Sequence, residues 1–280
     1  MFKSIKRKFK KLLQLIGYWL VDLGKPDSPF SKTNLSFDTY MRLAKEASNE
    51  KYDEIDSYEA LLGFKVDKSW LDELALHTQI VIKDSKLCYA HGRVLYSSLS
   101  SYLTNLNQKN VDEEITILET GTARGFSAIC MAKALKDNGF GGKILTFDLI
   151  PNEKKMFWNC IDDQDGAKTR LELLNPWKEL LDEHIIFIEG DTRHTLKSCS
   201  LGRVYFAFLD GAHTYEDVMF EFFQIKDKQL EGDVIVYDDY SNNLFPGIVK
   251  AVDHICKEYK YERKDIFAAD NRAYVIATKK

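Results

Sequence analysis

The sequence predicts a doubly wound α/β protein with a seven-stranded, mostly parallel sheet, an antiparallel C-terminal hairpin and an N-terminal helical cap. Three observations predict this fold. From residue 112 onward, short apolar segments rich in β-branched and aromatic residues alternate with amphipathic helical segments, as in parallel sheets covered on both faces. The last two apolar segments are separated only by a turn. Residues 35–105 show helical periodicity alone.

Residues 1–24 are predicted to form a basic amphipathic helix. Apolar residues recur there every three or four positions, and six of the chain's 39 basic residues fall within residues 1–11. The remainder has 33 basic and 43 acidic residues, so the first helix differs sharply in charge from the rest of the chain. Two interpretations fit equally: contact with an anionic membrane surface or a partner groove, and packing on the chain's own domain.

Residues 25–108 are predicted to be a linker followed by a helical cap. The breaker-rich stretch Gly24-Lys25-Pro26-Asp27-Ser28-Pro29 ends the first helix. Cap helices are predicted at Phe37–Ala47, Trp70–Lys83 and Tyr89–Leu106. His91 precedes the apolar pattern of the third helix and could reach over a pocket, although a structural role is favoured for it.

Residues 109–280 are predicted to form the α/β domain. Its parallel strands are predicted at Ile115–Glu119, Lys143–Asp148, Ile185–Ile188, Val204–Leu209 and Asp233–Tyr237. Its helices are predicted at Ser127–Lys136, Asn175–Glu183, Thr192–Ser198, Tyr215–Leu230 and Pro246–Tyr259. The closing hairpin is predicted from Arg263–Phe267 and Ala273–Thr278. The long stretch 150–184, with Phe157-Trp158-Asn159 and Trp177, is predicted to contribute to a substrate lid.

Composition narrows the class of protein. A hydrophobic content of 45% and a charged content of 29% are ordinary for a globular domain, and a net charge of −4 gives no reason to expect nucleic-acid binding. The five cysteines are scattered without a C-x-x-C pair, which indicates reduced thiols of a cytoplasmic protein. No apolar run approaches the roughly 20 residues that a membrane span needs.

A glycine-containing loop connects the first predicted strand of the sheet to its helix. Its pattern is Glu119-x-Gly121-Thr122-x-x-Gly125-x-Ser127. Glycine allows the sharp turn and the close approach of a ligand to the backbone. The spacing differs from the G-x-G-x-x-G of dinucleotide loops, and the preceding acid suits a cationic ligand. Alone, this pattern would favour a plain strand–helix turn over a ligand loop.

Further acids follow the next two strands. Asp148 ends the second predicted strand, and Glu189-Gly190-Asp191 follows the third. The carboxyl ends of strands in an open α/β sheet face a common ligand crevice, where an acid commonly binds the ribose hydroxyls. Together with the loop, these residues predict a nucleoside pocket, with Asp191 placed beside the base.

A second acidic group follows strands four and five. Asp210 ends strand four, His213 comes three residues later, and Asp238-Asp239 follow strand five. Neighbouring strand ends bring these carboxylates together, and such a group needs a compensating cation, for which oxygen ligands favour Mg²⁺ or Ca²⁺. His213 could accept a proton. The competing interpretation makes Asp210 and Asp239 helix caps and His213 a turn residue; the metal site is favoured.

The whole motif set resembles a known family. Residues 88–280 resemble class I methyltransferases, which are Rossmann-like and use S-adenosylmethionine (SAM). The motifs that carry this resemblance are E-T-G-T-x-x-G-x-S, F-D, G-D, L-D-G-x-H-x-Y-E-D and D-V-I-V-x-D-D-Y. More narrowly, they resemble metal-dependent small-molecule O-methyltransferases, including those acting on sugars of macrolide and aminocoumarin natural products.

The resemblance implies a role for each motif residue. Glu119 and Gly121 would line the methionine end of SAM, Asp148 would bind the ribose, and Asp191 would neighbour the adenine. The implied SAM-binding set is Glu119, Gly121, Thr122, Gly125, Ser127, Asp148 and Asp191. The implied ligands of Mg²⁺, or of another hard divalent cation, are Asp210, Asp238 and Asp239, with His213 and Asp210 as the catalytic pair.

Two departures from the family pattern concern the metal site. Some sugar methyltransferases have an acid where this chain has Ala212, so the base could be His213 or be supplied otherwise. Catechol-type relatives carry D-N where this chain has Asp238-Asp239, and the extra negative charge should strengthen cation binding.

These expectations combine into SAM-dependent O-methylation of a small-molecule or glycan hydroxyl, assisted by a divalent metal. The alternative is a catalytically inactive, membrane-associated binding protein on the same scaffold. A dehydrogenase is disfavoured because G-x-G-x-x-G is absent. The predicted location is cytoplasmic, with residues 1–24 as a candidate peripheral contact at the inner membrane surface, and a homo-oligomer is compatible with the sequence.

Overall fold

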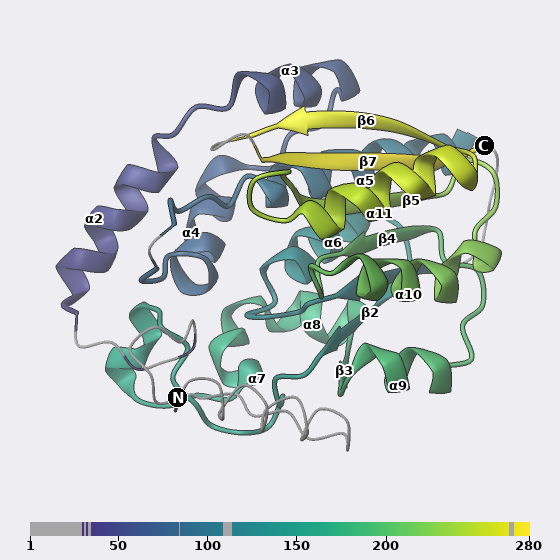
Figure 1. The fold of residues 1–280 in the computed structure, drawn as a ribbon. Coiled ribbons are helices and arrows are strands. Elements are labelled where there is room, and N and C mark those ends of the chain that lie inside the picture. Colours follow the sequence, from purple (N-terminus) through teal and green to yellow (C-terminus); the bar gives the residue numbers. More distant parts are fainter. Residues whose placement is uncertain (1–29, 31, 33–34, 84, 109–113, 269–271) are drawn as a thin grey trace, which may run out of the picture.

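The structure, a computed structural model, describes residues 30, 32, 35–83, 85–108, 114–268 and 272–280 (Figure 1). A seven-stranded sheet with the order β3-β2-β1-β4-β5-β7-β6 forms its centre. The strands are β1 (Ile115–Thr120), β2 (Gly142–Asp148), β3 (Ile185–Glu189), β4 (Phe206–Leu209), β5 (Val234–Tyr240), β6 (Tyr261–Phe267) and β7 (Ala273–Lys279). Strands β1–β5 pair in parallel, whereas β7 pairs antiparallel with β5 and with β6. The predicted mostly parallel sheet with an antiparallel C-terminal edge is confirmed.

Helices cover both faces of the sheet. Helices α5 (His91–Gln108), α6 (Phe126–Asp137) and α8 (Lys178–His184) lie on one face, and α9 (Thr192–Ser198), α10 (Tyr215–Ile225) and α11 (Pro246–Glu258) lie on the other (Figure 1). The connections between these strands and helices contain the short helix α7 (Arg170–Leu173) and 3₁₀ turns at Ile161–Asp165, Asn175–Trp177 and Lys226–Lys228. This is the doubly wound arrangement expected from the sequence.

Side-chain alternation along the strands divides the core into two layers. In β4, Phe206 and Phe208 pack in the layer that contains α5 and α6, whereas Ala207 and Leu209 pack in the layer that contains α10 and α11. All four side chains are buried, because a central parallel strand is covered on both faces. The continuous apolar run of this strand follows directly from that position.

Residues 35–108 contain one helix more than predicted. Three helices precede α5 where the sequence predicted two: α2 (Phe37–Ser48), α3 (Asp53–Leu62) and α4 (Lys68–Thr78), of which α3 is the element that periodicity missed. Three acids in the first turn of α3 favour its N-terminus electrostatically, and Gly63 ends it at a left-handed φ of 78°. Arg93 of α5 pairs with Glu59 and Asp56 and thereby fixes α3 to α5.

The predicted helix Trp70–Lys83 is too long, because α4 stops at Thr78. The β-branched run Ile80-Val81-Ile82 that comes next is non-helical. The Asn159 side chain satisfies this backbone: its Oδ1 accepts the Ile82 N–H at 3.0 Å, and its Nδ2 donates to the Ile82 carbonyl at 2.8 Å. A distant amide thus supplies the hydrogen bonds that a helix would otherwise provide.

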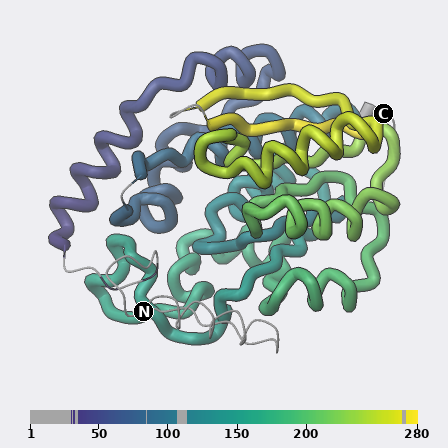
Figure 2. The backbone as a smooth tube through the Cα atoms, viewed as in Figure 1, coloured from purple at the N-terminus to yellow at the C-terminus, as the bar shows by residue number. Residues whose placement is uncertain are grey.

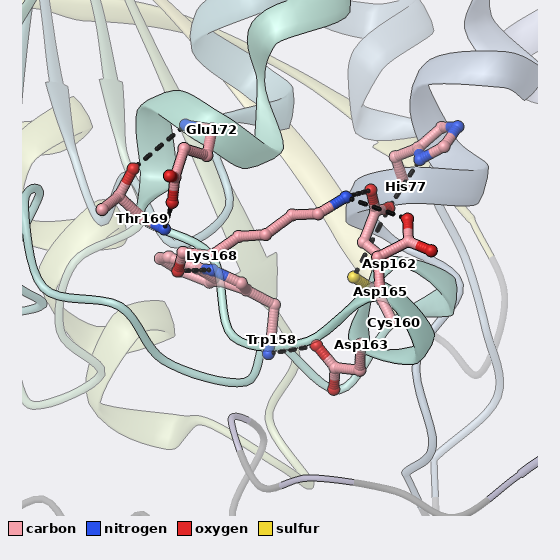
Figure 3. Close-up of polar contacts among 9 residues, drawn as sticks. All are labelled: His77, Trp158, Cys160, Asp162, Asp163, Asp165, Lys168, Thr169 and Glu172. Carbon is pink, nitrogen blue, oxygen red and sulfur yellow. Dashed lines mark hydrogen bonds and ion pairs between the residues drawn. The ribbon is translucent and has the colours of Figure 1, made fainter.

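The segment 150–174 is a folded connection with a polar centre (Figure 3). The Asp162 carboxylate lies between Lys168, at 2.7 Å, and His77 of α4, at 2.6 Å. The Asp163 carboxylate accepts the Trp158 N–H at 2.7 Å. Trp158 and Trp177 are buried and pack in the interior, while the contribution of this segment to a substrate lid stays a prediction.

Helices α2 and α4 of the cap lie on the side of the sheet's carboxyl edge, whereas α3 packs against β6 and α5. Strand β6 runs in the same direction as β5, and its arrow points toward the side where α2 and α4 lie (Figure 1; the same arrangement is seen in the tube of Figure 2). Helix α5 instead packs along α6 on the sheet, where the Tyr102 hydroxyl donates to Asp233 at 2.6 Å. The carboxyl ends of β1, β4 and β5 therefore face the cap.

Some predicted features lie outside the described residues. These are the basic helix of residues 1–24 and the hairpin turn at residues 269–271. Within the described part, none of the helices has the length and apolarity that crossing a bilayer requires. The five cysteines, which are all described, are free thiols, as predicted.

Candidate functional site

The glycine loop after β1 has the left-handed backbone that its sequence requires. Gly121 and Gly125 have φ values of 88° and 85°. A Cβ on Gly121 would lie 2.3 Å from the Asp210 carbonyl oxygen, since the ends of β1 and β4 touch there. The Gly121 N–H donates to the Phe147 carbonyl at 2.9 Å. The loop is therefore closely packed between its two neighbouring strands.

Glu119 lies beneath this loop and is completely buried. Its carboxylate accepts hydrogen bonds from the hydroxyls of Ser127 and Thr146, and Thr146 also contacts Thr122. Burial raises the pKa of Glu119 to about 7, although both hydroxyl bonds favour the ionised form. The structure thus joins three predicted SAM-binding residues, Glu119, Thr122 and Ser127, in one buried network.

Asp148, at the end of β2, connects the loop to the 150–174 segment. Its carboxylate accepts the N–H groups of Ala123, at 2.5 Å, and Ile150, at 2.9 Å. Arg170 is fully buried, lies 3.3 Å from Asp148 and donates through Nε to the Ala123 carbonyl at 2.9 Å. Burial raises the pKa of Asp148 and Arg170 opposes this rise. Arg124 in turn donates to the Trp158 carbonyl at 2.6 Å.

A cleft opens at the carboxyl ends of β1–β4. It is lined by Gly121, Phe147, Asp148, Leu149, Gly190, Asp191, Thr192, Arg193, Gly211, Ala212, Asp217 and Glu221. Asp191 caps α9 and accepts the Arg193 N–H at 2.9 Å. The cleft therefore joins the loop to both acids that the sequence assigned to a nucleoside, Asp148 and Asp191.

Glu221 is a cleft residue that sequence reasoning missed. It is buried on α10 and accepts the hydroxyls of Thr120, at 2.8 Å, and Thr192, at 3.1 Å. Burial raises its pKa to about 7. The signal that the sequence offered was a glutamate placed between two phenylalanines, Phe220 and Phe222.

The predicted acidic cluster assembles at the ends of β4 and β5. Ligand atoms of Asp210, His213 and Asp239 all lie within 4.8 Å of one another. His213 Nε2 lies 3.1 Å from Asp239 Oδ2, and the imidazole stacks on Phe245 at 4.5 Å between ring centroids. The third member of this close group is His213, whereas the sequence predicted Asp238 as the third ligand.

Asp238 and Asp239 share an irregular part of β5. The register with β7 shifts between Tyr237 and Tyr240, and Asp239 has a left-handed φ of 58°. This bulge breaks the alternation that would send adjacent side chains to opposite faces. Asp238 Oδ1 accepts the Asp239 N–H at 2.6 Å.

Electrostatics differ strongly among the three aspartates. Burial, with Asp238 and Asp239 nearby, raises the pKa of Asp210 well above its usual range. Burial and Asp239 raise the pKa of Asp238 to about 6. Burial opposes ionisation of Asp239 as well, but His213 and Arg272 hold its pKa below the usual range. Asp239 is therefore the most readily ionised carboxylate of the cluster.

Arg272 and His91 complete the surroundings of the cluster; sequence reasoning did not single out Arg272 and favoured a structural role for His91 over a place above the pocket. Arg272 Nη1 lies 2.8 Å from Asp239 Oδ1. His91 begins α5 with its ring 4.7 Å from that of Phe126, and its Nδ1 is buried without a hydrogen-bond partner. Burial lowers the pKa of His91 to about 3, so it is neutral. The sequence could have indicated Arg272 only by its position, since it directly precedes β7, which begins at the carboxyl edge of the sheet.

Comparison with known proteins agrees with this geometry. Residues 118–240 match the family described as a methyltransferase domain, and this range contains the loop, the cleft and the acidic cluster. No curated protein sequence matches the chain. Residues 118–240 are therefore similar to a methyltransferase domain, and they include four of the five parallel strands of the sheet in whole and the fifth in part, together with the acidic cluster.

Solved structures share the fold at low sequence identity. The O-methyltransferase TomG from Streptomyces achromogenes, involved in tomaymycin synthesis and solved with SAM, has a TM-score of 0.54 at 14% identity, covering 82% of this chain and 97% of its own. Cofactor-bound Rv0187 from MTB has a TM-score of 0.50 at 14% identity, covering 88% and 98%. At this identity the likeness concerns the fold.

Proposed function

We propose that the protein transfers a methyl group from SAM to a hydroxyl of a small molecule or glycan, assisted by a divalent cation. One observation carries the proposal: the four residues after β4 belong to both halves of the site. Gly211 and Ala212 line the cleft, whereas Asp210 and His213 belong to the acidic cluster. A cofactor in the cleft and a cation in the cluster would therefore lie side by side.

The cleft fits SAM by its chemistry. Asp148 and Asp191 offer carboxylate oxygens to ribose hydroxyls and to the adenine side of the cleft. Glu119 places negative charge beneath the glycine loop, where it would favour the cationic methionine end. Thr122, Gly125 and Ser127 hold the loop in shape through the contacts described above. Bound SAM would supply the methyl group, with its sulfonium as the leaving centre.

The cluster also fits a divalent cation. Asp210 and Asp239 provide carboxylate oxygens, and either His213 or a reoriented Asp238 would complete the protein ligands. Oxygen ligands favour Mg²⁺, whereas inclusion of an imidazole suits Mn²⁺ better. A bound cation would lower the pKa of the acceptor hydroxyl that it contacts.

The protein groups then handle the proton. His213 is 44% exposed and is oriented by Asp239 and by the Phe245 ring. Its imidazole would accept the hydroxyl proton while the acceptor oxygen forms a bond to the methyl carbon and the carbon–sulfur bond breaks. Asp239 would stabilise the resulting imidazolium. If His213 instead ligates the cation, the hydroxyl proton would leave to solvent. The cation alone would then activate the acceptor hydroxyl, by lowering its pKa.

Calorimetry tests the proposal directly. SAM should bind with a measurable heat, and turnover to S-adenosylhomocysteine with hydroxylated acceptors should require Mg²⁺ or Mn²⁺. Absence of SAM binding would rule out the methyltransferase. SAM binding without turnover on any acceptor would favour a binding protein on this scaffold. His213→Gln distinguishes the two roles of the imidazole, since loss of turnover with unchanged Mn²⁺ binding identifies it as the base.

The charge pattern of residues 1–24 carries a proposal about where the enzyme meets its acceptor. Residues 1–24 carry the basic amphipathic pattern of a peripheral membrane contact. We propose that this segment brings the enzyme to an anionic membrane surface. Co-sedimentation with anionic liposomes should be lost when residues 1–24 are deleted, and equal sedimentation of both proteins would contradict the proposal. Sedimentation velocity of the full chain would reveal whether it forms a homo-oligomer.

A further inference from the structure

Arg272 contacts the acidic cluster directly. It precedes β7, which enters the sheet at the carboxyl edge, and its guanidinium lies 2.8 Å from Asp239 Oδ1. The other oxygen of the same carboxylate lies 3.1 Å from His213 Nε2. Both oxygens of Asp239 are thus engaged by nitrogen atoms of the protein.

The contact between Arg272 and Asp239 is an ion pair without an aligned hydrogen bond. Asp239 is only 9% exposed, and its Oδ1 is buried without a hydrogen-bond partner despite the nearby guanidinium. A buried carboxylate oxygen in this state retains the capacity to bind a better-placed cation. The strained left-handed backbone of Asp239 holds the oxygen in that position.

Charge balance explains why an arginine is placed there. Three carboxylates at this edge repel one another, and Arg272 interacts with all three: Asp210, Asp238 and Asp239. The other charged or titratable groups that interact with Asp239 or Arg272 are His213, His91, Lys83, Tyr52, Cys88 and Tyr274. Among these groups, Arg272 alone makes a cationic ion pair with the cluster through a permanently charged side chain.

We propose that Arg272 is the resident counter-ion of the cluster and competes with a divalent cation for Asp239. The guanidinium neutralises the cluster when the cation is absent, and it must release Asp239 Oδ1 when the cation binds. Arg272 therefore lowers the affinity for divalent ions and makes their binding reversible. This inference rests on the proposed divalent site, and it assigns to Arg272 a positioning role on that site.

The test measures Mn²⁺ binding to the full chain by electron paramagnetic resonance, without SAM or acceptor. Arg272→Gln should bind Mn²⁺ about tenfold more tightly than the wild type, because the competing charge is gone. Arg272→Lys keeps the charge and should stay near the wild-type affinity. Arg263→Gln is the matched control, since Arg263 pairs with Asp253 and Asp265 away from the cluster; its affinity should be unchanged.

The outcomes separate this inference from the proposed function. Equal or weaker Mn²⁺ binding by R272Q, with binding by the wild type, overturns the competition and leaves the cation site standing. No binding by either protein overturns both. Mn²⁺ binding by R272Q but not by the wild type would mean that Arg272 blocks the cation site, and it supports the competition.

A second measurement applies if R272Q does not fold. In the wild-type protein, the Arg272 Nε nuclear magnetic resonance signal, assigned by its loss in R272K, should shift on addition of Mg²⁺. An unshifted signal at saturating Mg²⁺ overturns the proposal.

Discussion

Replacing Glu119 by glutamine should stabilise the protein without cofactor and weaken its binding of SAM. The pKa of Glu119 is raised from 4.5 to about 7 because the carboxyl group is buried. A raised pKa means that the folded state disfavours the ionised form, so stability falls as the pH rises from 4.5 toward 7. The full loss, about 3 kcal/mol, is present above pH 7.

The glutamine variant should therefore differ from the wild type in two assays: it should be more stable to urea at high pH, and its SAM affinity should not rise with pH. At pH 8, its free energy of unfolding in urea should exceed that of the wild type by up to about 3 kcal/mol, and near pH 4.5 the two should converge. The hydroxyls of Ser127 and Thr146 can rotate to accept from the new amide. Calorimetry should show SAM affinity rising toward pH 8 in the wild type only, because a cationic ligand favours the ionised Glu119.

Glu221→Gln provides the matched control. Glu221 is also buried, with its pKa raised to about 7, but its hydrogen bonds are to Thr120 and Thr192 and not to the glycine loop. It should give a similar gain in stability while keeping the pH dependence of SAM binding that Glu119 causes. A Glu119→Gln variant that is no more stable than the wild type at pH 8 would refute the reasoning, since the two hydroxyl bonds would then outweigh the burial.

Three further variants test other parts of the site. Gly121→Ala should lose about 2–4 kcal/mol in urea unfolding, because its Cβ would lie 2.3 Å from the Asp210 oxygen on a left-handed backbone; a smaller loss would mean that the loop can move aside. Asp210→Asn should raise the melting temperature of the cation-free protein by relieving repulsion and should remove Mn²⁺ binding; retained Mn²⁺ binding would exclude Asp210 as a ligand. Arg170→Lys should weaken SAM binding by about tenfold, because a single ammonium cannot reach both Ala123 and Asp148; an unchanged affinity in calorimetry would show that the loop needs no such support.

Local patterns allowed much of this fold to be predicted. Strand β4 could be located because its four apolar side chains are buried on both faces, and the Gly121 turn because few other residues adopt its backbone. The approach of Asp210 to Asp239 followed from topology, since neighbouring parallel strands end at the same edge, whereas the close group contains His213 in place of the expected Asp238.

The parts that could not be predicted depend on contacts between distant segments. The end of α4 at Thr78 reflects hydrogen bonds from Asn159, which lies 77 residues beyond Ile82. The place of Arg272 beside Asp239 depends on a bulge in β5, and no local pattern indicates a bulge there. Helix α3 is short, and the contacts that hold it come from other segments: Ile55 and Tyr58 are buried in the common core, and Arg93 of α5 pairs with Glu59.

The connection through the 150–174 segment bears on the order in which substrates bind. Arg124 of the glycine loop holds the Trp158 carbonyl, and the neighbouring Asn159 side chain holds Ile82, next to Lys83, whose charge interacts with Asp239. The glycine loop and the Ile82–Lys83 segment are thus connected by hydrogen bonds through Trp158 and Asn159. We expect SAM to bind first and the acceptor second, and initial-rate kinetics with S-adenosylhomocysteine should then show competition against SAM and noncompetitive inhibition against the acceptor.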